Sequence, residues 1–267
     1  MENIKRRTSV RTFDKKEISR DDMDKLVGFI NNIEEEYGDY RFPMIHSNLD
    51  GKVGTYGVIS GGNTYICGIV KKENPDLIEL GYLFEKIILF ATSIDLGTCW
   101  LGGTFNRSEF AEKVGLTPEE SFICASPIGY VADKKSVKER AMRKMAKSDQ
   151  RKEFSEIFTD MDFKALNKDE LGVYGQALEM VRIGPSASNK QPWRIVKEEN
   201  LYHLFLERTP NYAKELEYDI QLLDMGIAKY HFERTLRENG EDGYWGKVDS
   251  HPDYDNFEYI STWLKEM

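Results

Sequence analysis

The sequence predicts an α+β fold built from two similar halves. Apolar residues at helical spacing alternate with runs of β-branched and aromatic residues, and the order helix, hairpin, long helix, glycine turn with tryptophan, strand occurs twice. When Gly81 is aligned with Gly226, Trp100 falls on Trp245 without a gap, because both intervals are 19 residues. We therefore expect two copies of one unit, related by a pseudo-two-fold axis like the subunits of a homodimer.

The first half carries signals for a helix, a hairpin and a second, more apolar helix. Ser19 and Asp22 have capping-box spacing and precede apolar residues at helical spacing, which predicts a helix over 20–37. Residues 53–70 alternate aromatic and β-branched residues around a Ser-Gly-Gly-Asn turn, which predicts a hairpin. The broad apolar face from Leu77 to Ala91 predicts a central helix.

A polar, basic segment over 133–152 follows a predicted short helix near 108–114 and a strand over 121–131. We take this basic segment as the boundary between a first domain, 1–150, and a second domain, 151–267. Both domains are long enough to bury a core of their own.

The second half repeats these signals. Asn167 and Glu170 again have capping-box spacing, and the helix that they begin is expected to run to about Arg182. The remaining predicted elements are strands over 194–196, 201–207 and 257–264 and a long helix near 216–239.

The composition is that of a folded, acidic protein. Of the 267 residues, 40% are hydrophobic and 12% aromatic, which excludes wholesale disorder, and the net charge of -9 disfavours nucleic acid as a partner. The odd number of cysteines without a C-x-x-C pair indicates buried thiols in a reducing compartment. Neither a signal peptide nor an apolar run of about 20 residues is present, so we expect a cytoplasmic protein without a membrane partner.

Several chemistries are absent by inspection. The sequence contains no dinucleotide-binding G-x-G-x-x-G, no P-loop, no H-E-x-x-H and no G-x-S-x-G. The four histidines are scattered, so neither a metal site nor a catalytic triad is predicted. We therefore assign no catalytic acid, base or metal ligand.

A positively charged, hydroxyl-bearing segment opens the chain, from Arg6 to Phe13. In an extended backbone Arg7, Ser9 and Arg11 point to one side and Val10 to the other. Two guanidinium groups flanking a hydroxyl are suited to bind a phosphate. The alternative is an ordinary solvated basic arm.

A second unusual segment is Gly184-Pro-Ser-Ala-Ser-Asn-Lys-Gln-Pro-Trp193. Prolines near both ends restrict the backbone, and the small residues between them let backbone amides and the Asn189 side chain approach a planar ligand closely. The alternative is a plain turn between a helix and a strand.

Together these two segments resemble the FMN-dependent nitroreductase family. The run Arg7-Thr-Ser-Val-Arg-Thr-Phe13 is similar to its R-x-S-x-R-x-F opening, and the loop to its P-S-x-x-N-x-Q-P-W segment. The run Leu96-Gly-Thr-Cys-Trp-Leu-Gly-Gly103 and the basic Lys138-Glu-Arg140 are similar to later family segments. The resemblance implies a three-layer α/β/α fold with mainly antiparallel sheets and bound FMN.

The resemblance also implies roles for particular residues. Arg7, Ser9 and Arg11 would hold the phosphate and ribityl end of FMN, and the backbone amides of Gly102 and Gly103 would lie near the flavin N5 edge. Further residues implied are Lys138 and Arg140 at the phosphate and Pro185, Ser186, Ala187 and Asn189 around the ring.

One departure from the family pattern has a direct consequence. The proline-bracketed loop normally follows soon after the basic opening, whereas here it lies in the second half. The family binds its flavin at a dimer interface and takes this loop from the partner subunit. We therefore expect one composite site per chain, one FMN and a monomer.

For activity, the resemblance implies ping-pong hydride transfer from NADH or NADPH through FMN to a small-molecule electron acceptor, such as a nitroaromatic or quinone. Family members also carry out reductive dehalogenation and flavin remodelling, so these stay open. A flavin-binding or storage protein with little turnover is a further alternative, and so is an anion or nucleic-acid binder that uses the two basic segments.

Overall fold

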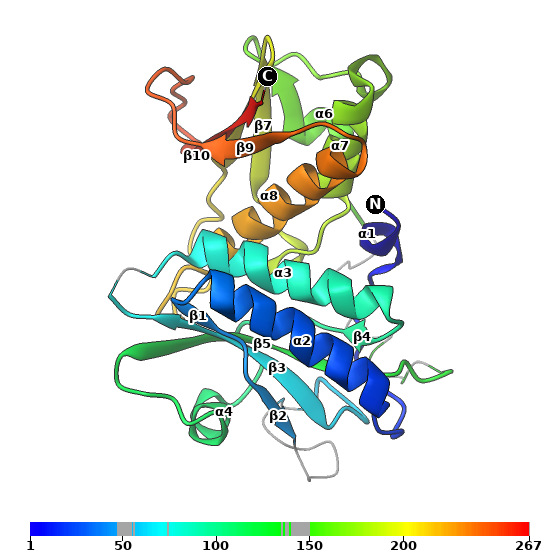
Figure 1. The fold of residues 1–267 in the computed structure, drawn as a ribbon. Helices are drawn as coiled ribbons and strands as arrows, with labels where there is room; N and C mark the ends of the chain where they lie inside the picture. The colour runs from blue at the N-terminus through cyan, green and yellow to red at the C-terminus, as the bar shows by residue number, and fades with distance from the viewer. Residues whose placement is uncertain are drawn as a thin grey trace. The chain divides into compact units, whose positions relative to one another are not determined.

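The computed structural model describes residues 1–46, 55, 57–73, 75–134, 136, 139 and 150–266 (Figure 1). The chain divides into two compact units, each described by itself. What we call the C-terminal unit comprises Met1–Lys5, Leu77–Tyr82 and Lys147–Met267. The N-terminal unit comprises Arg6–Asp76 and Leu83–Ala146.

The N-terminal unit is built on an antiparallel sheet with strand order β1-β3-β5-β4, in which β2 also pairs with β3. The central pair runs from Thr64 opposite Ile128 to Lys71 opposite Glu120. The strands are β1 (Tyr40–Arg41), β2 (Met44–His46), β3 (Thr64–Lys71), β4 (Gly97–Thr98) and β5 (Glu120–Gly129), and the helices are α2 (Arg20–Glu36), α3 (Leu77–Ser93, whose residues up to Tyr82 belong to the other unit) and α4 (Arg107–Lys113).

The predicted helices of this unit are confirmed. The Ser19 hydroxyl accepts a hydrogen bond from the Asp22 amide and caps α2. The helix α3 is the buried central helix that its apolar face predicts, with Phe84 fully buried. The rings of Phe29 on α2 and Phe90 on α3 stack with centroids 4.0 Å apart.

The hairpin predicted over 53–70 is wrong in its first strand. The strand β3 begins only at Thr64, and its hairpin partner is β2 at Met44–His46. Residues 57–59 are not in a strand, and the Ser60 amide and carbonyl instead bond the N-terminal segment at Arg11 and Phe13. Ile59 is therefore buried beside that segment rather than in a hairpin strand, which sequence spacing alone does not reveal. Residues 53, 54 and 56 of the predicted hairpin lie outside the described residues.

The C-terminal unit has a second five-stranded sheet, of order β6-β7-β8-β10-β9, in which all pairs except the parallel β6 and β7 are antiparallel. Fully buried Trp193 and Trp263 pack in its core. The strands are β6 (Phe158–Asp160), β7 (Trp193–Glu198), β8 (Leu201–Leu206), β9 (Gly243–Gly246) and β10 (Glu258–Lys265). The helices are α1 (Glu2–Arg6, whose last residue belongs to the other unit), α6 (Phe154–Ile157), η1 (Lys168–Leu171), α7 (Val173–Arg182), η2 (Ala187–Asn189) and α8 (Ile220–Glu238).

Two helices of this unit differ from their predicted bounds. The single helix expected from Asn167 is split into η1 and α7, because Gly172 between them has a φ of 56°. The long helix begins at Ile220, because the Asp219 side chain accepts the Gln221 amide and caps it there.

The two sheets repeat one connectivity. The succession β3, α3, β4, β5 gives the sheet order β3-β5-β4, and β8, α8, β9, β10 gives β8-β10-β9. In each unit a tryptophan indole bonds the preceding long helix: Trp100 Nε1 donates to Glu85 Oε2 at 2.7 Å, and Trp245 Nε1 to the Lys229 carbonyl at 3.2 Å. The predicted α+β class with mainly antiparallel sheets is confirmed.

Within the C-terminal unit, the start of α3 crosses α8 at two glycines. A Cβ on Gly81 would lie 2.3 Å from the Leu223 carbonyl oxygen, and one on Gly226 would lie 2.0 Å from the Ile78 carbonyl oxygen. Gly81 thus faces Leu223, three residues before Gly226, and Gly226 faces Ile78, three residues before Gly81. Such reciprocal contacts are typical of a two-fold axis. These are the two glycines that the sequence alignment superposes.

Two further observations concern the described residues. None of their helices combines the length and the apolarity that a membrane crossing requires. Their three cysteines, Cys67, Cys99 and Cys124, are free and buried, as predicted.

We expect Gly226→Ala to destabilise the protein, because the added methyl group would meet backbone atoms that cannot move independently. A loss of about 1–3 kcal/mol or more is the usual effect of overpacking, measured as the free energy of unfolding in urea. The control is Gly28→Ala on the exposed face of α2, where a Cβ meets nothing within 4 Å. That change should stabilise the helix by about 0.5–1 kcal/mol. Equal stability of the two variants would contradict the tight crossing.

Candidate functional site

The basic N-terminal segment is built into the N-terminal unit through its backbone. Ser9 forms a parallel bridge with Thr98, and the Val10 amide donates to the Thr98 carbonyl at 2.8 Å. The Phe13 amide donates to the Ser60 carbonyl at 2.8 Å. Because Val10 and Phe13 are buried in the core, this segment, which we call the arm (Arg7–Phe13), is not a solvated tail.

The three arm residues predicted to bind phosphate all influence one buried thiol, that of Cys99. Burial raises the pKa of Cys99, and the charges of Arg11 and Arg7, together with a hydrogen bond to Ser9, oppose this rise. The Arg7 side chain is itself buried. All three arm side chains thus act on this thiol, and their role at a phosphate stays a prediction.

Charge and hydrogen bonding make this cluster suitable for an anion. The Arg11 Nε and Nη1 atoms are buried and find no hydrogen-bond partner within the described residues, a deficit that an anionic group would offset. The nearby carboxylate is that of Glu139, which is 3% exposed and accepts a hydrogen bond from the Thr12 hydroxyl at 2.7 Å. Thr12 also accepts the Ser136 amide at 3.1 Å. Thr12 thus links the arm to the segment that follows β5.

The other residues implied at this end of the flavin are placed in part. Gly102 and Gly103 follow Leu101, whose backbone pairs with Ala125 of β5, and the Gly102 carbonyl accepts a hydrogen bond from Arg107. Lys138 and Arg140 lie outside the described residues, so their predicted roles stay predictions.

The predicted ring-binding loop, Pro185–Gln191, has an unusual backbone in the C-terminal unit. Ser188, Asn189 and Gln191 have φ values of 48°, 56° and 51°, a left-handed conformation that costs non-glycine residues about 1–2 kcal/mol each. A hydrogen bond from the Gln191 amide to the Ser186 hydroxyl, at 2.8 Å, closes the turn. This is more than a plain turn between helix and strand.

Side chains from other segments hold this loop. Arg151 donates to Asn189 Oδ1 at 3.1 Å, and Asn189 Nδ2 donates to the Gln150 carbonyl at 2.9 Å. The Tyr212 hydroxyl donates to the Ser188 hydroxyl at 2.9 Å. The Asn189 amide, expected to meet the flavin, is thus already oriented by protein groups.

A buried carboxyl group on α8 also supports the loop. Asp224 is 2% exposed, and its Oδ1 accepts the Ala187 amide at 2.9 Å. Burial raises the pKa of Asp224 well above its ordinary value, and the Ala187 hydrogen bond opposes this only in part.

Sequence reasoning missed Arg151, Tyr212 and Asp224. The sequence could have indicated Asp224, because an acidic residue among the apolar positions of a predicted long helix is expected to be buried. Buried acidic side chains are rare unless another group pairs with them. Arg151 and Tyr212 stand in polar segments where nothing in the local pattern distinguishes them.

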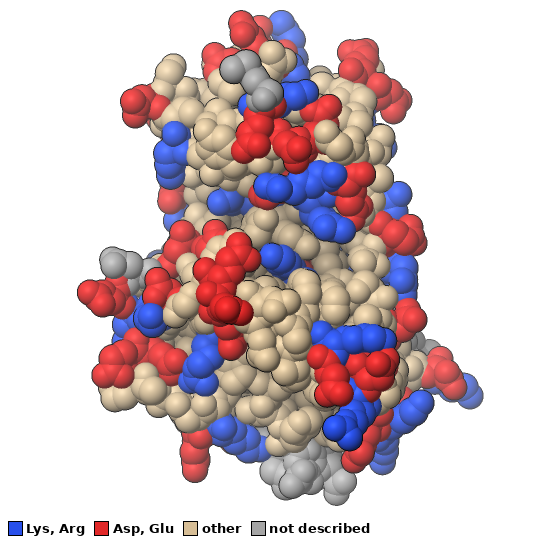
Figure 2. All heavy atoms as spheres, in the orientation of Figure 1, with Lys and Arg blue, Asp and Glu red and all other residues tan. Residues whose placement is uncertain are grey.

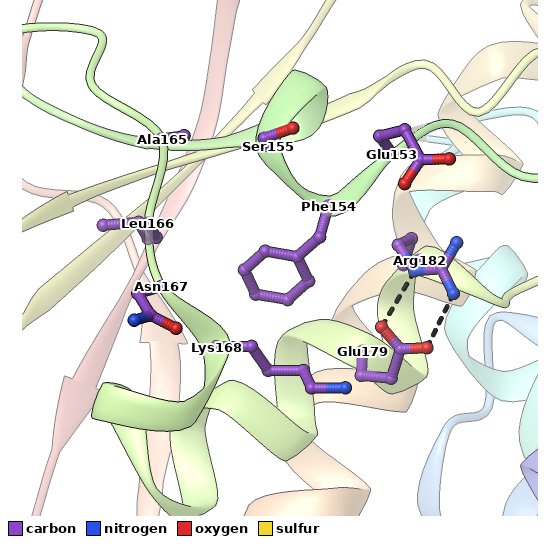
Figure 3. Close-up of a pocket in the computed structure, with 9 residues that line it drawn as sticks. All are labelled: Glu153, Phe154, Ser155, Ala165, Leu166, Asn167, Lys168, Glu179 and Arg182. Carbon is purple, nitrogen blue, oxygen red and sulfur yellow. Dashed lines mark hydrogen bonds and ion pairs between the residues drawn. The ribbon is translucent and has the colours of Figure 1, made fainter.

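An open hollow of about 640 Å³ lies elsewhere in the C-terminal unit, beside α6, η1 and α7 (Figure 3). The Phe154 ring lines it, and the Arg182 guanidinium at its side is paired with Glu179 through two hydrogen bonds of 2.8 and 2.7 Å. None of the predicted flavin-binding residues lines this hollow. The Arg182 guanidinium is already paired with Glu179, so this hollow gives no reason to place the phosphate of the flavin there.

The predicted site residues thus form two groups. Arg7, Ser9, Arg11, Gly102 and Gly103 belong to the N-terminal unit, and Pro185, Ser186, Ala187 and Asn189 belong to the C-terminal unit. The convergence of both groups on one flavin stays a prediction. No group of three or more His, Cys, Asp or Glu side chains within the described part of the chain is arranged to hold a metal ion.

The chain is similar to known nitroreductases. A family model described as "Putative TM nitroreductase" matches residues 1–236. A crystal structure of a "putative nitroreductase" from Thermotoga maritima matches 99% of this chain and 91% of its own, with 21% identity and a TM-score of 0.59. This likeness over the whole length agrees with the fold described above.

Shorter matches occur as well. A nitroreductase family protein from Clostridium novyi covers 49% of this chain and 84% of its own, with 21% identity and a TM-score of 0.42. A protein described as an FMN-dependent nitroreductase, from Clostridium difficile, covers 50% of this chain and 88% of its own, with 21% identity and a TM-score of 0.40. No curated protein matches the chain significantly.

We expect Thr12→Val to weaken the N-terminal unit, because the isosteric valine leaves the buried Glu139 carboxylate without this donor and the Ser136 amide without this acceptor. Buried groups deprived of a partner cost about 1–3 kcal/mol, measured as the free energy of unfolding in urea. Thr12→Ser keeps the hydroxyl and should lose less. A valine variant as stable as the wild type would show that the link between arm and segment contributes nothing.

Proposed function

The chain belongs to the nitroreductase family described as "Putative TM nitroreductase", and from this membership we propose that it is an FMN-dependent oxidoreductase. The observation that carries the proposal is the arm, where the charges of Arg11 and Arg7 and a hydrogen bond to Ser9 act on the buried Cys99 thiol. The unpartnered Arg11 nitrogens support an anionic ligand at this place.

FMN fits the chemistry of the residues present. Its phosphate carries nearly two negative charges, which several cations and a hydroxyl can offset in a partly buried site. The left-handed loop presents small side chains and an oriented amide, which suits a planar ring. The residues proposed to hold FMN are Arg7, Ser9, Arg11, Lys138 and Arg140 at the phosphate, Gly102 and Gly103 near N5, and Pro185, Ser186, Ala187 and Asn189 around the ring.

Bound FMN would supply two-electron chemistry, taking hydride from NADH or NADPH and passing it to a nitroaromatic or quinone-like small molecule. The residues of the chain position the flavin, balance its charge and exclude water, and none is assigned as an acid or base. We propose one FMN per chain and a monomer, because the loop and the arm come from the two halves of one polypeptide.

The surface charge does not favour nucleic acid as a partner. On the face drawn in Figure 2, basic and acidic side chains are interspersed, and the net charge is -9. Binding to a phosphate backbone gains from a continuous basic surface. The arm cations are therefore better explained by one small phosphate.

We expect the purified protein to be yellow and to bind FMN near one equivalent per chain. Ser9→Ala or Arg11→Met should weaken FMN binding roughly 10- to 150-fold, because each removes a hydrogen bond to a charged phosphate worth about 1.5–3 kcal/mol. Quenching of flavin fluorescence measures the dissociation constant.

Arg20→Ala is the matched control, since this arginine side chain is 96% exposed on α2 and should not affect FMN. A colourless protein that cannot be loaded with FMN would refute the proposal. Steady oxidation of NADH or NADPH with a nitroaromatic acceptor separates an enzyme from a storage protein, which binds FMN without turnover.

A further inference from the structure

Asp224 stands apart from the residues that the family resemblance implies, yet it contacts the ring-binding loop directly. We propose that Asp224 is a positioning residue, which fixes the loop Pro185–Gln191 through the Ala187 amide in the shape that borders the flavin. The inference deepens the proposed function and rests on it.

The first argument is the hydrogen bond itself. Asp224 projects from α8, and its Oδ1 accepts the Ala187 amide at 2.9 Å. This amide lies at the start of η2, the short turn whose next two residues, Ser188 and Asn189, have left-handed backbones. A bond at this point therefore defines where the strained part of the loop begins.

The second argument is the state of the carboxyl group. The Asp224 side chain is 2% exposed, and its Oδ2 atom has no hydrogen-bond partner within the described residues. A carboxylate with a bare buried oxygen is strongly disfavoured. Burial raises the pKa of Asp224, and the negative charge of Asp219 raises it further. Tyr212 is a titratable neighbour, whose own pKa is raised by its burial and further by Asp224. Asp224 therefore serves as an uncharged hydrogen-bond acceptor.

The third argument is that the loop needs support. Three left-handed non-glycine residues within four positions persist only where surrounding contacts over-determine the backbone. The Tyr212 and Arg151 contacts hold Ser188 and Asn189 by their side chains. Asp224 holds the backbone, so its loss should affect the whole loop.

If Asp224 acts as an uncharged hydrogen-bond acceptor, an amide side chain at this position should replace it without loss of FMN affinity. Asp224→Asn keeps a neutral carbonyl oxygen for the Ala187 amide, so FMN affinity should stay within about threefold of the wild type. Asp224→Leu has similar volume but no acceptor, and should weaken FMN binding roughly 5- to 100-fold. FMN titration by fluorescence quenching provides the dissociation constants.

The matched control is Thr235→Val, which removes another fully buried polar group from α8, the hydroxyl that donates to the His231 carbonyl at 2.7 Å. It should lower the melting temperature and leave FMN affinity within threefold. Hydrogen exchange of the Ala187 amide, measured without FMN, gives a second readout. Exchange should be faster in Asp224→Leu and unchanged in Asp224→Asn.

If Asp224→Leu fails to fold, Ala187→Pro removes the donor from the other side of the same bond. Ser186 has an extended backbone, which a following proline accepts, and the first position of a helical turn tolerates proline. This variant should weaken FMN binding to a similar degree.

Three results would overturn the inference: unchanged FMN affinity in both Asp224→Leu and Ala187→Pro, an asparagine variant as weak as leucine, or unchanged exchange at Ala187 in Asp224→Leu. If the wild type binds no FMN, the proposed function fails. The exchange measurement then still decides whether Asp224 fixes the loop.

Discussion

The close approach of α3 and α8 is the constraint around which the C-terminal unit is organised. At Gly81 and Gly226 each helix backbone occupies the space that a side chain of the other would need. Neither position has room for a Cβ atom, so the crossing fixes the register of α8 as well as its distance from the start of α3. Asp224 lies two residues before Gly226, and the crossing therefore also sets where this carboxyl group meets the loop.

Both candidate binding segments are held by the same physical means. Neither is a regular helix or strand over its length, and each would be flexible if only its own backbone acted. The arm is fixed because its amides and carbonyls bond Thr98 and Ser60 while Val10 and Phe13 enter the core. The loop is fixed by the side chains of Arg151, Tyr212 and Asp224, which come from three separate segments. Side chains are thus oriented before any ligand arrives, which lowers the entropy lost on binding.

The protein chemistry in this proposal is electrostatic and positional. The arm contributes guanidinium groups and a hydroxyl, whereas the loop contributes backbone amides, hydroxyls and the Asn189 side chain. In the proposed function the two-electron chemistry belongs to FMN, and no residue of the chain is assigned as an acid or base.

The sequence alone determined the class of fold, its repeated order of elements and the two chemically distinctive segments, because these depend on local spacing: helical apolar faces, the caps at Ser19 and Asn167, and the motifs around Ser9 and Asn189. The sequence pattern did not predict the loop at Ser60 or the break at Gly172 between η1 and α7. It also did not single out Arg151, Tyr212 and Asp224. Those features depend on contacts between residues far apart in the sequence. Only the tertiary structure decides such contacts, because burial and hydrogen-bond partners are properties of the packed molecule and leave no periodic pattern in the sequence. The burial that raises the pKa of Asp224 is one of these properties.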